Sequence, residues 1–371
     1  MPDVSVRASV QMSQMNKNAL FWIGPLVLAS LVSVAAAPSH QTAKTDRAKA
    51  TPVRPVAAPT AAVRPGTRYS AARSQTRKMT LARARAVAMA REMAATALPR
   101  YKTDATGALV PDLRAEAAII YDPETNQVLW EENSQARRSI ASITKVMTAT
   151  VFFENDPDLR EPVTITRSDV FQASTTHLRV NDQVTADDLV HLLLIASDNA
   201  AARALARISP HGLEGFVGRM NQKARELGLE STSYADPSGL LSENVSSAYD
   251  MAQLITLASN DERIASIMRT AEYTIRTAKG RLVAFRSTNH LLREPDFDIR
   301  AGKTGFITKA GYCLVTLLRM PQGGPQFAVV VLGARSNAGR FLETRNLFDW
   351  LSTKASTLLS TTTPAPQPQI P

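Results

Sequence analysis

A serine and a lysine three positions apart, Ser142 and Lys145, head a largely apolar run (SITKVMTATVFF). Residues at i and i+3 share a helical face, so the hydroxyl and the amine can come within hydrogen-bond reach. A helix that is apolar on most sides is buried, and burial lowers the pKa of a lysine. A neutral amine beside a serine is a general base beside a nucleophile. This pair could therefore act as a nucleophile and its base.

The S-x-x-K pattern is short and should arise on the order of once by chance in a chain of 371 residues. The alternative is an ordinary surface lysine, but such a lysine would want a polar face for its head group. Ser139 suits the N-cap of this helix. That cap would place Ser142 in the first helical turn and Lys145 one turn further on.

An S-x-N pattern occurs three times after Ser142, and context selects the first, Ser197-Asp198-Asn199. It ends the apolar run LVHLLLIA and precedes another helical stretch, AAARALARI. A polar loop between buried helices can present side chains into a cleft. The other two copies, at 242–244 and 287–289, lie in turn-like or mixed surroundings.

Lys303, Thr304 and Gly305 form the only K-T-G. On a strand edge, the cation and the hydroxyl could hold a substrate carboxylate, and the glycine would let a ligand approach the backbone closely. A simple turn is the alternative. The pattern is not a phosphate loop, which needs G-x-x-x-x-G-K.

These motifs need a scaffold, and the hydrophobic pattern predicts a mixed α/β domain over 109–359. Apolar runs bounded by turn residues predict an early and a late β-hairpin, and the pattern between them is mostly helical. Strands at both ends imply one sheet built from the two chain ends, covered on both faces, with a helical insertion over one side. Thr185 is a predicted N-cap with Asp188 three residues on. The predicted strands are 117–122, 127–132, 311–320 and 325–335, and a last helix follows at 338–355.

The flanking segments have a different composition. Residues 1–37 read as an export signal with an uncharged run ending in small residues, although an uncleaved anchor would look similar. Residues 38–108 are rich in Ala, Pro and Arg and predict a disordered linker, in which 80–98 could form a helix. The Pro- and Thr-rich residues 360–371 predict a disordered tail. The localisation expected from this arrangement is the periplasm or another extracytoplasmic compartment.

The net charge of +10 is carried by the linker rather than by the domain. Residues 38–102 hold 14 Lys and Arg against 2 acidic residues, whereas the chain from 103 onward holds 27 basic and 30 acidic residues. The linker is a solvated tether or an electrostatic contact with an anionic wall or membrane surface. Export argues against a nucleic-acid partner. The single cysteine, Cys313, excludes an internal disulfide and suggests a buried strand thiol.

The three motifs occur in the order S-x-x-K, S-D-N and K-T-G, 55 and then 106 positions apart. Because the three motifs occur in this order, the sequence resembles the penicillin-binding, D-alanyl-D-alanine peptidase family. Further stretches share the resemblance, including LRVNDQVTADDLVHLLLIASDNAAARALA and AGKTGFITKAGYCLV, so that it covers about 117–351. It implies a β-lactamase/transpeptidase-like fold, an antiparallel sheet from both chain ends flanked by helices with a mainly helical subdomain.

The resemblance also implies catalytic roles. Ser142 would attack the carbonyl of a D-alanyl bond and form an acyl-enzyme, and Lys145 would take its proton. Ser197 would relay a proton to the leaving amine. Main-chain N–H groups of Ser142 and Phe306 would form the oxyanion hole. Water would then release the product.

The remaining motif residues are implied to bind substrate. Asn199 would hold it, while Lys303 and Thr304 in the K-T-G segment ending at Gly305 would bind the carboxylate of the peptide or of penicillin. No metal or cofactor is implied, and the five histidines show no ligand spacing such as H-E-x-x-H. The expected partners are peptidoglycan peptides as substrates and β-lactam antibiotics as covalent inhibitors.

Four functions share these motifs. A class A β-lactamase needs a deacylating glutamate, and Glu214 and Glu226, which flank Asn221, lie in a stretch that looks like the peptidase family. Many D-alanyl-D-alanine carboxypeptidases add a β-rich C-terminal domain, whereas this chain ends one helix after its last hairpin. It is therefore most similar to the short D-alanyl-D-alanine endopeptidases, which cut peptide cross-links. An inactive wall-binding module is disfavoured because all three motifs are intact.

Overall fold

The computed structural model describes residues 66–361. The expected export signal at 1–37 lies outside the described residues, as do 38–65 of the expected linker and 362–371 of the expected tail. No helix within the described part is long and apolar enough to cross a membrane.

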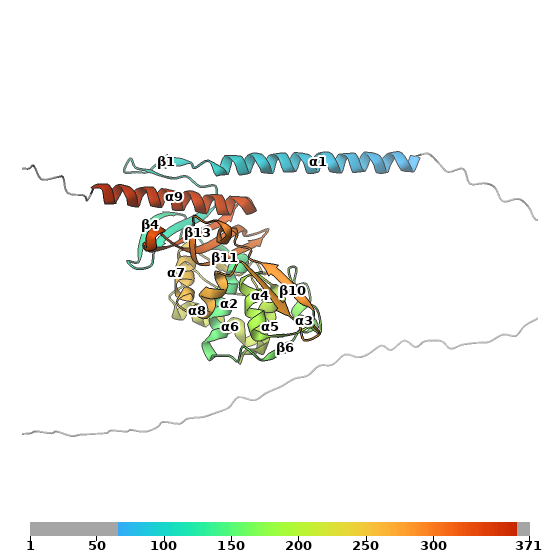
Figure 1. Cartoon of the computed structure of the whole chain (residues 1–371). Coiled ribbons are helices and arrows are strands. Elements are labelled where there is room, and N and C mark those ends of the chain that lie inside the picture. Colours follow the sequence, from blue (N-terminus) through green and yellow to red (C-terminus); the bar gives the residue numbers. More distant parts are fainter. Residues whose placement is uncertain (1–65, 362–371) are drawn as a thin grey trace, which may run out of the picture. The chain divides into compact units, whose positions relative to one another are not determined.

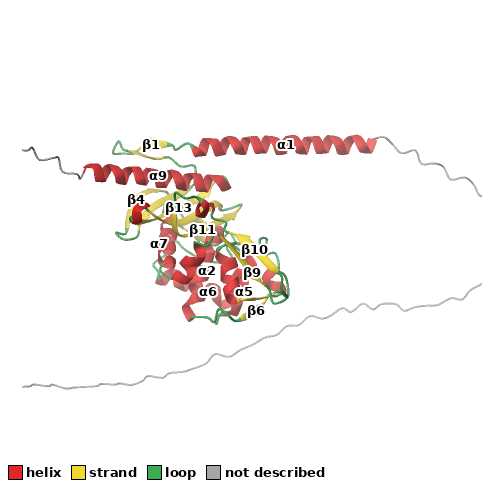
Figure 2. Ribbon diagram, in the orientation of Figure 1, coloured by secondary structure: helices red, strands yellow, loops and turns green. Residues whose placement is uncertain are grey.

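A five-stranded antiparallel sheet forms the centre of the domain (Figure 2). Strands from the early and late parts of the chain meet in its middle, where Val330 lies opposite Ile119. Both predicted hairpins are present, and a further strand precedes the late one and forms an edge of the sheet. The strands, in spatial order, are β11 (Asp298–Ile307), β12 (Gly311–Arg319), β13 (Gln326–Ala334), β3 (Ala117–Asp122) and β4 (Gln127–Glu132).

Alternate side chains of these strands supply two hydrophobic cores, one on each face of the sheet. On one face, Ile120, Leu314 and Val329 join Phe348 and Leu351 of α9 (Asn337–Thr361). On the other face, Ile119, Val315 and Val330 join the larger core of the helical part. The predicted fold class, a sheet from both chain ends flanked by helices with a mainly helical subdomain, is confirmed.

The helical part lies on the face of the sheet opposite α9 (Figure 1). Thr185 and Asp188 form the predicted capping box, in which each side chain accepts a hydrogen bond from the other's main-chain N–H. The helices are α2 (Thr144–Phe152), α3 (Arg167–Val170), α4 (Ala186–Leu194), α5 (Asn199–Ile208), α6 (Gly212–Glu226), α7 (Ala248–Ser259) and α8 (Glu262–Met268), with short 3-10 helices η1 (Ala141–Ile143), η2 (Phe153–Asn155), η3 (His290–Arg293) and η4 (Pro321–Gly323).

Three small antiparallel pairs complete this part of the chain. They are β5 (Arg138–Ser139) with β8 (Val245–Ser246), β6 (Pro162–Thr164) with β7 (Gln183–Thr185), and β9 (Glu272–Arg276) with β10 (Leu282–Arg286). The pairing of β5 with β8 directly precedes η1 and therefore fixes where the S-x-x-K segment begins.

The expected disordered linker differs from the structure after residue 65. A helix, α1 (Gly66–Ala97), begins well before the expected 80, because its Ala- and Arg-rich sequence favours helix and contains no proline. The expected domain start at 109 also falls inside a hairpin, in which β1 (Tyr101–Thr103) pairs with β2 (Leu109–Pro111). Asp104 closes its turn by accepting hydrogen bonds from the main chain of Thr106 and Ala108.

Candidate active site

Ser142 lies in η1, between a strand and a helix rather than in a capped first helical turn. The expectation that Ser139 caps the helix is wrong, because Ser139 belongs to β5 and pairs with Val245. Ala141 takes a left-handed conformation (φ 49°), which makes a tight turn into Ser142. Gly239 packs against that turn, where a Cβ atom would lie 2.1 Å from the Ala141 carbonyl oxygen. The close approach leaves room for glycine only.

Lys145 lies in the first turn of α2 and its side chain is fully buried. Its Nζ lies 2.9 Å from Ser142 Oγ, 2.6 Å from Asn199 Oδ1 and 2.5 Å from the Ser238 carbonyl oxygen. A neutral amine has two hydrogens and one lone pair. If the two hydrogens bind Asn199 and Ser238, which can only accept at these atoms, the lone pair faces the Ser142 hydroxyl. The geometry suits proton removal from Ser142.

Burial lowers the pKa of Lys145 to about 7. The carboxylates of Asp198 and Asp236 oppose this shift, and the guanidinium of Arg203 adds to it. A pKa near neutrality is useful for a general base, because the free amine is abundant and still accepts a proton readily.

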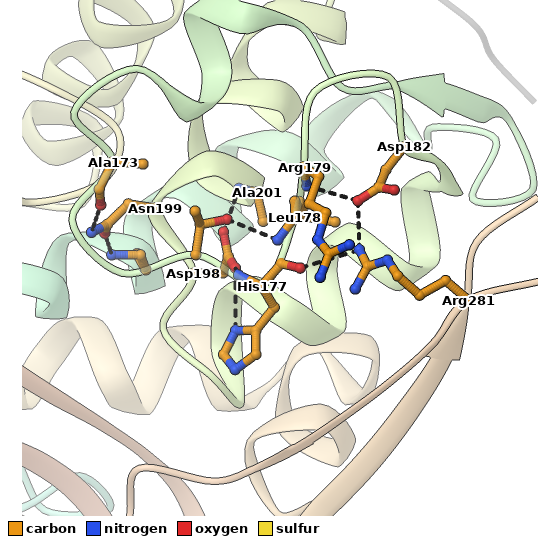
Figure 3. A network of polar contacts seen from close by, with 11 residues as sticks. Ala173, His177, Leu178, Arg179, Asp182, Asp198, Asn199, Ala201 and Arg281 are labelled. Atoms are coloured by element: carbon orange, nitrogen blue, oxygen red, sulfur yellow. Dashed lines mark hydrogen bonds and ion pairs between the residues drawn. The ribbon is translucent and has the colours of Figure 1, made fainter. Parts of the chain in front are cut away.

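Ser197 lies in the turn between α4 and α5, and Asn199 is the first residue of α5. Ser197 adopts a left-handed conformation (φ 59°), and its Oγ accepts a hydrogen bond of 2.8 Å from Lys303 Nζ. The side-chain nitrogen of Asn199 donates to the Ala173 carbonyl at 2.7 Å, as Figure 3 shows. Both ends of this amide are therefore engaged within the protein. Asn199 therefore helps to orient Lys145, and because it also lines the cavity, its substrate-holding role stays a prediction.

The K-T-G residues lie in β11, at the edge of the sheet that faces η1. Lys303 is buried, and its Nζ also donates to the Thr304 carbonyl at 2.9 Å. Burial lowers its pKa, as do the neighbouring charges of Lys145 and Arg340. An arriving carboxylate would favour the protonated form. Phe306 is about half exposed (48%) and stacks on Tyr312, with ring centroids 4.2 Å apart.

Two residues of the site were missed by the sequence analysis. Arg340, near the start of α9, donates to the carbonyls of Gly305 and Cys313 at 3.0 and 3.1 Å, and burial lowers its pKa to about 10. Thr288, from the third S-x-N copy, has its hydroxyl 2.6 Å from that of Thr304. Neither position carries a local signal, because each reaches the site only through long-range packing.

A cavity of about 420 Å³ opens where these elements meet. The guanidinium of Arg340 lines it, the Lys303 amine lies beside it at Ser197, and no described Asp or Glu lines it, so it suits an anionic group. No cluster of three or more His, Cys, Asp or Glu side chains that could hold a metal ion occurs among residues 66–361. The lining residues are Ser142, Ser174, Thr175, Ala196, Ser197, Asn199, Leu240, Thr288, Thr304, Gly305, Phe306, Ile307, Thr308 and Arg340.

The backbone of β11 passes very close to η1 at Gly305. A Cβ atom there would lie 2.7 Å from the Ile140 carbonyl oxygen and 3.2 Å from the Ser142 nitrogen. Ser142 and Phe306, on the two sides of this contact, both line the cavity, and their main-chain N–H groups stay the predicted oxyanion donors. Such a pair of donors is the requirement for an oxyanion hole.

Gly305→Ala is expected to slow acylation of Ser142 by a β-lactam on the order of 100-fold, because the added methyl group must push β11 away from η1 and misplace one oxyanion donor. The measurement is the second-order acylation rate with a fluorescent penicillin. Gly218→Ala is the matched control for a glycine change, since a Cβ atom at that position meets nothing within 4 Å and its φ is not in the left-handed region. An acylation rate of Gly305→Ala equal to that of the control would contradict the oxyanion assignment.

A serine nucleophile bonded to a buried lysine, at the junction of an antiparallel sheet and a helical subdomain, defines a serine hydrolase of the β-lactamase/transpeptidase type. Comparison with known families gives the same result. Residues 104–336 match the model of the D-alanyl-D-alanine carboxypeptidase family, and the chain belongs to that family.

Individual relatives support this assignment. The chain is 34% identical over 251 residues to a D-alanyl-D-alanine endopeptidase of Pseudomonas aeruginosa, covering 66% of this chain and 79% of that protein. It is 32% identical over 252 residues to the Escherichia coli protein of the same name, covering 67% and 81%. Among solved structures, the Streptomyces K15 DD-transpeptidase is similar with a TM-score of 0.60 at 27% identity, over 65% of this chain and 97% of that chain.

Proposed function

We propose that this protein is a serine D,D-peptidase that acts on the stem peptides of peptidoglycan through an acyl-enzyme. The observation that carries the proposal is the contact between Lys145 Nζ and Ser142 Oγ, 2.9 Å long, with the amine at a pKa of about 7. The test is covalent labelling. Penicillin should add one acyl group to the protein, and intact mass measured over time should show it.

The proposed reaction begins when Ser142 Oγ attacks the carbonyl carbon of the D-alanyl bond while Lys145 accepts its proton. The negative charge on the carbonyl oxygen is stabilised by the main-chain N–H groups of Ser142 and Phe306. As the carbon–nitrogen bond breaks, the leaving amine receives a proton through the Ser197 hydroxyl, which is bonded to Lys303. Water then attacks the ester carbon, its oxygen stays on the released acid, and one of its protons goes to Ser142 Oγ as the ester C–O bond breaks.

The carboxylate of the leaving residue is assigned to the cationic end of the cavity. Thr304 offers a hydroxyl there, oriented by Thr288 at 2.6 Å. Lys303 and Arg340 supply positive charge without a described carboxylate partner in the cavity. Binding of a carboxylate at this end would place the preceding carbonyl at Ser142.

We favour endopeptidase activity on cross-links, with carboxypeptidase activity as the alternative. The relatives that are matched over the larger share of their own length are named endopeptidases. The family description, in contrast, names a carboxypeptidase. Purified protein should convert cross-linked muropeptide dimers to monomers faster than it removes the terminal D-alanine from pentapeptide monomers. Ser142→Ala is the control for contaminating activity. Faster release of D-alanine from the monomer would reverse the assignment.

A β-lactamase would require rapid deacylation. Of the two glutamates considered from the sequence, Glu214 is exposed and Glu226 pairs with Arg219 at 2.7 Å. Neither lines the cavity. The penicilloyl adduct is therefore expected to persist. An adduct that forms and disappears within seconds while the drug is consumed would indicate a β-lactamase.

The proposed place of action is the periplasm or another extracytoplasmic compartment, where peptidoglycan lies. This rests on the sequence of 1–37 and on the activity itself. The described part of the linker adds exposed arginines, Arg83, Arg85 and Arg91, along α1. These residues support the proposal that α1 contacts an anionic wall or membrane surface.

A further inference from the structure

The carboxylate of Asp198, between Ser197 and Asn199, is buried at the back of the site and has no described lysine or arginine partner. Its side chain is 0% exposed, and its one ion-pair contact among residues 66–361 is with a histidine, His177. A buried carboxylate is costly unless its oxygens are hydrogen-bonded or paired. The groups that hold Asp198 therefore help to set the geometry of the turn whose residues contact Lys145 and Lys303.

The two carboxylate oxygens of Asp198 accept hydrogen bonds from different parts of the chain. Oδ1 caps α5 by accepting from the Ala201 main-chain N–H at 3.0 Å. Oδ2 faces away from the helix toward His177, accepting from its main-chain N–H at 2.6 Å and lying 3.4 Å from its ring Nδ1. Figure 3 shows the imidazole below the carboxylate. When Nδ1 carries the proton, the imidazole donates a hydrogen bond to Asp198 Oδ2, on the side of the carboxylate that lies toward solvent.

His177 is itself held from two sides. Arg281 donates to its carbonyl oxygen at 3.3 Å and pairs with Asp182 at 2.5 Å, so that the loop around His177 is fixed (Figure 3). The imidazole packs against Phe285 of β10, with ring centroids 5.7 Å apart. About a third of the side chain (34%) remains exposed. The ring thus connects the buried carboxylate to solvent.

We propose that His177 is a positioning residue for acyl transfer, whose ring holds the Asp198 carboxylate under the Ser197–Asn199 turn. Through this turn, the His177 ring affects two hydrogen bonds in which it takes no part itself. One is the bond from Lys303 to Ser197, and the other is the bond from Lys145 to Asn199. The proposal rests on the proposed function, because it concerns the efficiency of acylation at Ser142.

The charges around Lys145 give the proposal a second readout besides rate. Asp198 is the largest of the charges that raise the pKa of Lys145, Asp236 also raises it, and Arg203 lowers it. If the carboxylate of Asp198 moves away when the ring is removed, the pKa of Lys145 falls. Because the neutral amine is the active form, the acid side of the pH–rate profile then moves to lower pH.

The test compares second-order acylation rates with a fluorescent penicillin between pH 5 and 9. His177→Ala is expected to react about tenfold more slowly at its optimum, with the acid side of its profile at lower pH. His177→Asn can place an N–H near the position of Nδ1, so it should recover most of the rate and the wild-type profile. His191→Ala is the matched control. The His191 ring stacks on Tyr273 of β9, the partner strand of β10, with ring centroids 4.0 Å apart, and it does not contact Asp198.

Three results would overturn the proposal. They are a rate for His177→Ala within twofold of wild type, a slower rate with an unmoved pH profile, or no recovery in His177→Asn. Hydrogen exchange of the peptide covering 197–203 supplies a readout that needs no acylation. Exchange in His177→Ala should rise there, because Asp198 caps the Ala201 N–H, and unchanged exchange would count against the proposal. Failure of the wild type to react would instead overturn the proposed function.

Discussion

Ser142→Ala is expected to form no covalent adduct with penicillin and to lose hydrolysis of muropeptides by on the order of 10⁵-fold or more. Ser142 Oγ is the hydroxyl bonded to Lys145 Nζ, and it lines the cavity together with Ser197. The change removes one partly buried oxygen, so the fold should be retained. Intact mass after mixing with penicillin measures the adduct, and thermal unfolding measures the fold.

The matched control for Ser142→Ala is Ser266→Ala, which removes an exposed hydroxyl on α8, away from the cavity lining. This variant should be labelled at the wild-type rate. Labelling of the Ser142→Ala protein, at any site and at a comparable rate, would show that the nucleophile is misassigned. A lower unfolding temperature together with lost labelling would require a second substitution, such as Ser142→Gly, before the result is interpreted.

Lys145→Met is expected to reduce acylation on the order of 10³-fold or more, because the base is removed while the serine remains. The wild-type rate should rise with pH through about 7, since the amine, whose pKa burial lowers to about 7, must lose its proton to act as a base. Below that pH the rate should fall about tenfold per pH unit. The Met variant should show no such acid limb.

Stability needs a separate measurement for Lys145→Met. The substitution leaves Asn199 Oδ1 and the Ser238 carbonyl without their buried donor, which should lower the free energy of unfolding by about 1–3 kcal/mol. Urea unfolding at pH 8 gives this value. An acid limb that persists unchanged in the Met variant would assign the titration to another group, and Lys303 would be the next candidate.

Local spacing made much of this site predictable. Ser142 and Lys145 are three residues apart, so their contact follows from one helical turn, whether that turn is 3-10 or α. The strand periods and the capping box at Thr185 are likewise local. The expected cap at Ser139 failed because a tertiary interaction overrode a local preference. The pairing of β5 with β8, more than a hundred residues away in sequence, drew Ser139 into a strand.

The rest of the site depends on contacts that no short pattern contains. The Ser238 carbonyl that binds Lys145 is a backbone atom, and any residue type could supply it. Arg340 looks like an ordinary polar position in an amphipathic helix until α9 is packed on the sheet. The sequence also could not show that the amide of Asn199 is used at both ends within the protein. Such assignments need the three-dimensional arrangement.

The meeting of β3 with β13 in the centre of the sheet has a consequence for how the enzyme is made. In this pair Ile119 lies opposite Val330. The early hairpin therefore cannot take its place inside the sheet until the last strand has been synthesised. A nascent chain that has emerged as far as Ser142 and Lys145 still lacks Lys303 and the strand that supplies one oxyanion donor. Such high contact order slows folding. The newly synthesised chain should therefore stay catalytically silent until nearly all of it has emerged.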